Sequence, residues 1–194
     1  MSKAKLPIAA LLNLSKLDLA VLVKDRLWSY QGFGMLRCYL DPQKRWRLNY
    51  WLPSIAVPNV SVIHDHPWSF TSYILRGQLM NIRYSMVPVE APTPPASKRF
   101  AYHEIITGEG GGPVATPKDC RLIEIERTIY TQGDVYSQVL DEIHETSALE
   151  GTITLNDRSQ PTQAHTARVF WPYGTSWVDA VPRAATAEEL AMIH

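Results

Sequence analysis

The chain contains 194 residues, in which 19 lysine and arginine residues balance 19 aspartate and glutamate residues, so its formal net charge is zero. This length fits one well-filled domain, and we predict a single domain over residues 1–194. A balanced charge offers no basic surface for nucleic-acid phosphates or anionic lipids. The composition therefore argues against nucleic acid and membranes as partners.

The two cysteines, Cys38 and Cys120, are far apart and form no Cys-x-x-Cys motif. Their spacing argues against a disulfide scaffold and for a reducing compartment, although one bond between them is compatible with the sequence. Residues 6–23 are rich in Leu and Ala but include Lys16 and Asp18, so their uncharged run is well below the roughly 18 residues that cross a bilayer. No small-residue cleavage site follows them. We therefore expect a cytoplasmic protein.

Residues 15–30 have the 3.6-residue apolar period of an amphipathic helix. The apolar face of this helix would consist of Leu19, Leu22, Val23 and Leu27. Ser15, followed three residues later by Asp18, resembles a capping box at the helix start. We assign residues 1–32 to an N-terminal helical segment that packs against a sheet or against a second copy of the chain, so a homodimer is a candidate assembly.

After this helix the apolar pattern changes to a period of two, which is typical of strands. Turn residues such as Pro53, Pro67 and Gly77 separate the runs. The predicted strands cover residues 35–40, 45–52, 60–66, 70–75, 78–86, 100–107, 121–131, 135–139, 151–155 and 167–171. Many short strands at close spacing indicate an all-β sandwich or barrel, which we place at residues 33–180.

Two loops and a tail complete this organisation. Residues 88–97 hold four prolines, and residues 108–117 include three consecutive glycines. The strands beside these loops, 100–107 and 121–131, are predicted to form an inserted hairpin on one rim of the barrel. The C-terminal tail, residues 181–194, contains the string Ala-Thr-Ala-Glu-Glu-Leu, which predicts a short helix.

The segment His64-Asp65-His66 carries the strongest functional signal. Side chains two residues apart on a strand point to the same face, so both imidazoles can bind one divalent transition metal while Asp65 points away. A lone pair of this kind is more often structural than functional. The second half of the sequence decides between the two interpretations.

A third histidine, His144, lies eleven residues after Gly133, which begins the turn pair Gly133-Asp134. Residues 64–66 with Gly77, and Gly133 with His144, resemble the two sequence motifs of the cupin superfamily. The resemblance implies a cupin-type jelly-roll barrel, with the hairpin insertion between the two motifs. It also implies one divalent metal bound by His64, His66 and His144.

The sequence departs from the cupin motifs at the expected glutamate ligand. That residue should fall near Phe70 or Thr71, and neither is a carboxylate. The site is then either a three-histidine metal centre or a degenerate, metal-free one. Three neutral nitrogen ligands leave open positions for substrate and O₂ on Fe(II), which is the metal we expect first. They also suit tetrahedral Zn²⁺ with one water, and Ni, Mn or Cu remain alternatives.

Among cupins, a three-histidine centre without glutamate resembles the thiol dioxygenases, of which cysteine dioxygenase is the type. The string Ser-Val-Ile-His-Asp-His at residues 61–66 is similar to theirs, and His-Asp-His-Pro-Trp at residues 64–68 also resembles small bacterial and phage-associated cupins of unassigned activity. The resemblance implies an arginine on an early strand that binds the substrate carboxylate, a place that Arg37 fills. The aligned active-site tyrosine is missing, and Tyr136 is a candidate because it lies on a predicted barrel strand.

These observations predict a mononuclear non-heme iron oxygenase or dioxygenase that acts with O₂ on a small polar metabolite, such as a thiol or amino-acid derivative. Arg37 and Tyr136 are the catalytic candidates, and Arg83 is a second candidate for binding an anionic group. Two alternatives stay open. One is a redox-silent metal-dependent isomerase, lyase or hydrolase, and the other is a non-enzymatic cupin that binds a small ligand.

Overall fold

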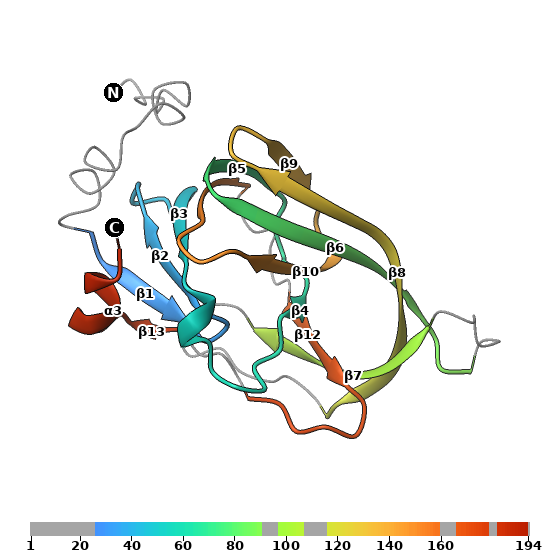
Figure 1. Cartoon of the computed structure of the whole chain (residues 1–194). Helices are drawn as coiled ribbons and strands as arrows, with labels where there is room; N and C mark the ends of the chain where they lie inside the picture. Colours follow the sequence, from blue (N-terminus) through green and yellow to red (C-terminus); the bar gives the residue numbers. More distant parts are fainter. Residues whose placement is uncertain (1–25, 91–96, 107–115, 160–165, 179–181, 194) are drawn as a thin grey trace.

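The computed structural model describes residues 26–90, 97–106, 116–159, 166–178 and 182–193. Nearly all of its regular structure is β (Figure 1). The strands are β1 (Trp28–Gln31), β2 (Met35–Tyr39), β3 (Trp46–Trp51), β4 (Ile63–His64), β5 (Phe70–Arg76), β6 (Gln78–Val87), β7 (Lys98–Ile106), β8 (Lys118–Thr131), β9 (Val135–Gln138), β10 (Ile143–Ala148), β11 (Ile153–Arg158), β12 (Thr166–Pro172) and β13 (Arg183–Ala184). A 3₁₀ turn, η1 (Pro53–Ile55), and one short helix, α3 (Ala187–Ala191), complete the described elements.

The strands form two antiparallel units. A seven-stranded sheet has the order β13-β1-β2-β3-β11-β5-β9, and six further strands close a barrel in the order β10-β4-β12-β7-β8-β6. The expected hairpin is present as β7 and β8, which pair with each other and also with the barrel strands β12 and β6. The predicted all-β barrel is therefore confirmed.

The seven-stranded sheet has one apolar face, and its opposite face is polar over β2, β3 and β11, because strand side chains alternate between faces. The apolar face carries a buried cluster that includes Leu36, Leu48 and Leu155, and Met192 and Ile193 beside α3 pack against it. The opposite face, called here the polar face, carries the intervening residues of β2, β3 and β11. These residues are Arg37, Tyr39, Arg47, Asn49, Thr154, Asn156 and Arg158.

A second apolar core lies in the closed barrel and includes Ile63 of β4, Ile143 of β10 and Phe170 of β12. His64 and His144 directly follow Ile63 and Ile143, so the alternation of the strands turns both imidazoles out of this core. The strand pairing places His64 opposite His144. Two distant parts of the sequence thus meet outside the barrel core.

Two predicted helices have different outcomes. The N-terminal helix predicted at residues 15–30 lies mostly outside the described residues, and its end is wrong, because Trp28–Gln31 forms strand β1. This strand is fixed by pairing with β2 and β13, which the local apolar pattern does not reveal. The short helix predicted in the tail is confirmed as α3, which begins with a capping box between Thr186 and Glu189.

Cys38 and Cys120 are both buried and free, so the described structure contains no disulfide between them. Cys38 belongs to the apolar core of the seven-stranded sheet, and Cys120 belongs to the core of the barrel. In the parts of the chain that the structure describes, no helix has the length and apolar character needed to span a membrane.

Candidate metal centre

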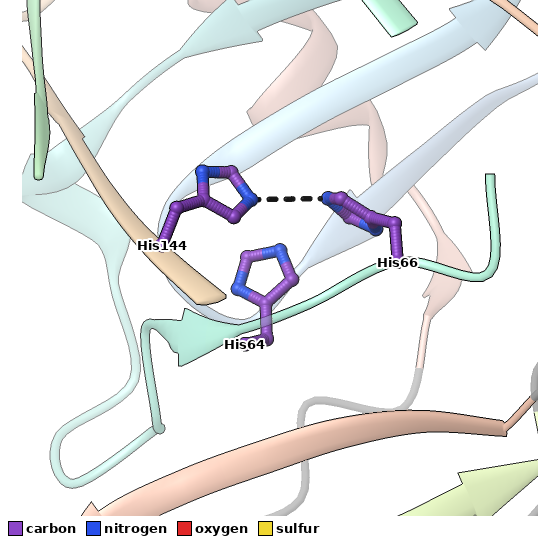
Figure 2. Close-up of side chains that lie close together, drawn as sticks. All are labelled: His64, His66 and His144. Carbon is purple, nitrogen blue, oxygen red and sulfur yellow. Dashed lines mark hydrogen bonds between the residues drawn. The ribbon is translucent and has the colours of Figure 1, made fainter. Parts of the chain in front are cut away.

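His64, His66 and His144 bring one ring nitrogen each into a single cluster, in which these atoms all lie within 4.8 Å of one another (Figure 2). His64 belongs to β4, His66 follows two residues later, and His144 belongs to the neighbouring strand β10. The ring centroids of His64 and His66 are 4.6 Å apart, and those of His64 and His144 are 4.8 Å apart. The three residues predicted as metal ligands are therefore together.

In the rings of His64 and His144, hydrogen bonds determine which nitrogen keeps the lone pair that can bind a metal. The Nδ1–H of His64 donates to the backbone carbonyl of Val62 at 2.9 Å. The Nδ1–H of His144 donates to the side-chain oxygen of Asn81, also at 2.9 Å. A neutral imidazole carries one proton, so both rings keep a lone pair on Nε2. Metal-binding histidines are oriented in the same way by an oxygen acceptor.

A chain of amide groups fixes the tautomer of His144. The Glu142 carboxylate accepts a hydrogen bond from Nε2 of Gln138. The Gln138 oxygen accepts from Nδ2 of Asn81. The Asn81 oxygen then accepts from the Nδ1–H of His144. Each amide orientation follows from the previous one because a carboxylate accepts only. Arg83 forms an ion pair with Glu142 at 3.3 Å and closes the chain.

The Nε2 atoms of His66 and His144 face each other at 3.2 Å. Two lone pairs at this distance repel each other unless a proton or a cation lies between them. Two nitrogens bound to one metal ion at about 2.0–2.1 Å lie about 3 Å apart, so the separation fits ligands of a shared ion. The donor set therefore fits a divalent transition metal.

Electrostatics favours the neutral imidazoles that a metal requires. Burial lowers the pKa of His64 and holds the pKa values of His66 and His144 well below the usual range. The charge of Arg47 lowers the pKa of all three rings further. Protons therefore compete weakly for these nitrogens near neutral pH.

Asp65 points away from the cluster, as the strand alternation predicted. Its carboxylate is buried and forms an ion pair with Arg168 of β12 at 2.5 Å. Its backbone N–H donates to the Arg168 carbonyl, which continues the extended pairing beyond the two residues of β4. This pairing explains how His64 and His66 share a face although β4 is short.

Aromatic rings occupy the surroundings of the histidines where the cupin pattern has a glutamate. The Phe70 ring lies 5.4 Å from His66 and 6.1 Å from His144. Phe33 stacks near His64 at 6.2 Å, and Trp68 stacks on His66 at 5.2 Å. Among the described residues, the one group of at least three His, Cys, Asp or Glu side chains positioned for a metal consists of these three histidines.

The other predicted site residues lie at different distances from this cluster. Arg37 lies on the polar face, where its Nε donates to Ser29 at 3.0 Å. Tyr136 lies on β9 and packs its ring against Phe70, whose ring also lies next to His66 and His144. Arg83 is bound by Glu142, by Glu126 and by the Ser137 carbonyl, so each of its three guanidinium nitrogens already has a partner.

Sequence reasoning missed Asn81, Gln138, Arg47 and Arg158. Arg47 alternates with apolar residues in β3, and Arg158 ends β11 beside Asp157, and both patterns are also typical of residues that face solvent. Both are buried on the polar face. Only the pairing of distant strands reveals this burial, and no local signal identifies it.

An all-β barrel with a three-histidine candidate metal centre is the class that this fold and site define. No family model matches the sequence, and no curated protein matches it. Among solved structures, the chain is similar to hydroquinone 1,2-dioxygenase from Sphingomonas sp. TTNP3 with 4-hydroxybenzoate bound, at 12% identity and a TM-score of 0.33. The match covers 61% of this chain and 61% of that one. At this TM-score the similarity supports no conclusion about fold or function.

Proposed function

We propose that the protein is a mononuclear non-heme iron oxygenase of the cupin type that acts on a small polar metabolite. The main support is the cluster of three neutral imidazoles without a carboxylate, within 4.8 Å of one another. Such a donor set leaves several coordination positions for a substrate and for O₂. The string at residues 61–66, which is similar to the thiol dioxygenases, agrees with this proposal.

The surroundings of the cluster favour oxygen chemistry over hydrolysis. A metal hydrolase needs a general base close to the reacting water. The ring contacts of the histidines are with Phe33, Trp68 and Phe70, and the nearest sequence carboxylate, Asp65, is held by Arg168. Aromatic rings exclude water and supply no base.

The bound ion would supply a redox-active Lewis-acid centre, and the protein groups would hold and orient the reactants. His64, His66 and His144 would bind the ion, and Asn81 would keep His144 in the required tautomer. In this proposal Arg37 contributes positive charge to the polar face. Tyr136 stays protonated, because burial raises its pKa to about 12, and its ring would support Phe70.

Elemental analysis of the full chain, purified without oxygen, tests the metal site. We expect one iron ion per chain, and we expect the His64→Ala and His144→Ala variants to lose it. His103→Ala is the matched control, because the His103 ring packs against Trp171 and Trp177 and lies outside the cluster. If His144→Ala keeps the metal while His64→Ala loses it, the three-histidine assignment is wrong.

Oxygen consumption tests the activity. With iron bound, we expect oxygen uptake when small thiols and organic acids are added, and none in the His64→Ala variant. Zinc or nickel without oxygen uptake would contradict the oxygenase and support a redox-silent metal enzyme. A protein without metal above background would contradict both and leave the ligand-binding cupin.

A further inference from the structure

Four buried side chains of the polar face form one continuous group across β3 and β11. Arg47 of β3 lies directly opposite Asn156 of β11 in the strand pairing. Opposed residues of an antiparallel pair project to the same side. Asn49 and Arg158 lie two residues from Arg47 and Asn156 on their own strands, so they share this face.

Each of these side chains has a polar atom without a hydrogen-bond partner. The exposed fraction is 6% for Arg47, 1% for Asn49, 4% for Asn156 and 8% for Arg158. The unpaired atoms are the Nε groups of both arginines and the side-chain oxygens of both asparagines. An unpaired buried polar group costs about 1–3 kcal/mol, and more when it is charged. Such a group therefore indicates a place for a polar ligand or for water.

The charge of this group is one-sided. Burial, together with the charges of Arg158 and Arg37, lowers the pKa of Arg47, so the three guanidinium groups act on one another. Within the described ranges, no ion pair joins a carboxylate to any of the three. Buried cations of this kind are stabilised by a bound anion.

The group is adjacent to the histidine cluster. The Arg158 guanidinium lies over the Trp68 ring at 4.0 Å, and the other neighbour of this ring is His66, at 5.2 Å. A small molecule held by the arginines can therefore extend towards the candidate metal.

We propose that the polar face binds a small hydroxylated carboxylate, with Arg47 and Arg158 on its acid group and the oxygens of Asn49 and Asn156 accepting from its hydroxyl groups. Guanidinium groups match carboxylates in geometry and charge. The asparagine oxygens require a donor from the ligand. A hydroxyl group satisfies this requirement better than an ammonium group, because three guanidinium groups repel a second cation.

The role of the hydroxylated carboxylate as a substrate rests on the proposed oxygenase function. Binding itself requires no metal. It is therefore tested on the full chain freed of metal by a chelator, so that failure of binding and failure of metal chemistry are separate results.

Thermal unfolding at constant ionic strength, with four matched probes, measures this binding. The reference probe is succinate, which carries two carboxylates and no other polar group. Malate adds a hydroxyl group to succinate, and aspartate adds an ammonium group. Succinamide has neutral amides in place of both carboxylates. A ligand that binds only the folded state raises the unfolding temperature with concentration. We expect the largest increase with malate, a smaller one with succinate and aspartate, and none with succinamide.

Arg47→Met and Arg158→Met are expected to weaken malate binding at least tenfold, while Arg45→Met binds as the parent protein does. Arg45 precedes β3 and is exposed, with Asp157 as its partner, so it is the matched control. We expect Arg47→Met to raise the unfolding temperature without ligand, since it removes a buried unpaired charge. Equal stabilisation by succinamide, no effect of malate, or equal loss in Arg45→Met would overturn the proposal and leave water as the partner of these atoms.

Discussion

At the scale of single residues, His144 is held most firmly of the three histidines. Its Nδ1–H is bound by Asn81, whose oxygen also accepts from Thr146 at 3.2 Å. Gln138 and Glu142 then fix the orientation of the Asn81 amide. The residue that determines the usable nitrogen of His144 thus lies on β6, 63 residues away in the sequence.

Replacing Asn81 by leucine, which has a similar shape, removes the nearer acceptor of the His144 N–H and leaves it only the Thr146 hydroxyl at 3.3 Å. We expect the affinity for a divalent metal to fall about 10-fold to 100-fold, as is typical when the support of a metal-binding histidine is lost. Competition with a chromogenic chelator for Zn²⁺ measures this change.

Asn81→Asp keeps an oxygen acceptor for His144, loses only the N–H that donates to Gln138, and is the control for this prediction. It should retain affinity within a few-fold of the parent protein. Equal loss of affinity in both variants would show that Asn81 acts through packing and does not orient the ring. Circular dichroism of both variants checks that each is folded.

At the scale of strands, the sequence predicted most elements because their apolar alternation and turn residues are local properties. β5 was predicted at residues 70–75 and runs from Phe70 to Arg76. β1 was missed because Trp28–Gln31 gains its strand conformation from pairing with β2 and β13. Strand alternation predicted that His64 and His66 share a face, and the resemblance to the two cupin motifs added His144.

The polar face was not predicted, because burial of a strand depends on what packs against it. Arg47 and Asn49 alternate with Leu48 and Tyr50, which is also the pattern of a sheet with one solvated face. In the structure both residues are buried, and β3 pairs with β11 in the interior of the seven-stranded sheet. Contacts between distant segments decide this, and a single sequence does not contain them.

Gly77, between β5 and β6, illustrates a turn that the sequence did predict. Its φ is +80°, and a Cβ added there would lie 2.9 Å from the Cα of Thr152. Gly77→Ala should therefore lower the free energy of unfolding by more than the about 1–2 kcal/mol of a left-handed alanine alone. Urea unfolding followed by circular dichroism measures the difference.

Gly133→Ala separates the cost of the left-handed backbone from the cost of the steric contact with Thr152. Gly133 has a φ of +93°, but an added Cβ would meet no atom within 4 Å. Its substitution should cost only the conformational part, about 1–2 kcal/mol. Equal destabilisation by both variants would mean that the contact with Thr152 contributes nothing.

At the scale of the whole molecule, the described residues form three buried apolar clusters, and the two that lie in the seven-stranded sheet and in the barrel each contain one buried thiol. Cys38 lies in the core of the seven-stranded sheet, and Cys120 lies in the core of the barrel. Burial raises the pKa of Cys38 to about 12 and that of Cys120 to about 11. The candidate metal centre lies outside both cores, so each core can be tested without changing a metal ligand.

These raised pKa values predict lower stability at alkaline pH. An unfolded thiol ionises near pH 9, while the folded protein keeps both thiols protonated up to about pH 11 to 12. The folded state binds more protons in this window. The contribution of the thiols to the free energy of unfolding is therefore fully present below pH 9 and is lost as the pH rises. Each thiol contributes a slope of up to about 1.4 kcal/mol per pH unit.

Urea unfolding between pH 8 and about pH 10 measures this slope, since both thiols titrate only in the unfolded chain over that range. We expect the slope to become shallower in Cys38→Ala and in Cys120→Ala, and shallowest in the double variant. If only one single variant changes the slope, the other thiol titrates equally in the folded and unfolded states, and its core opens without global unfolding. Equal contributions from both thiols would instead show that the two β units unfold as one cooperative structure.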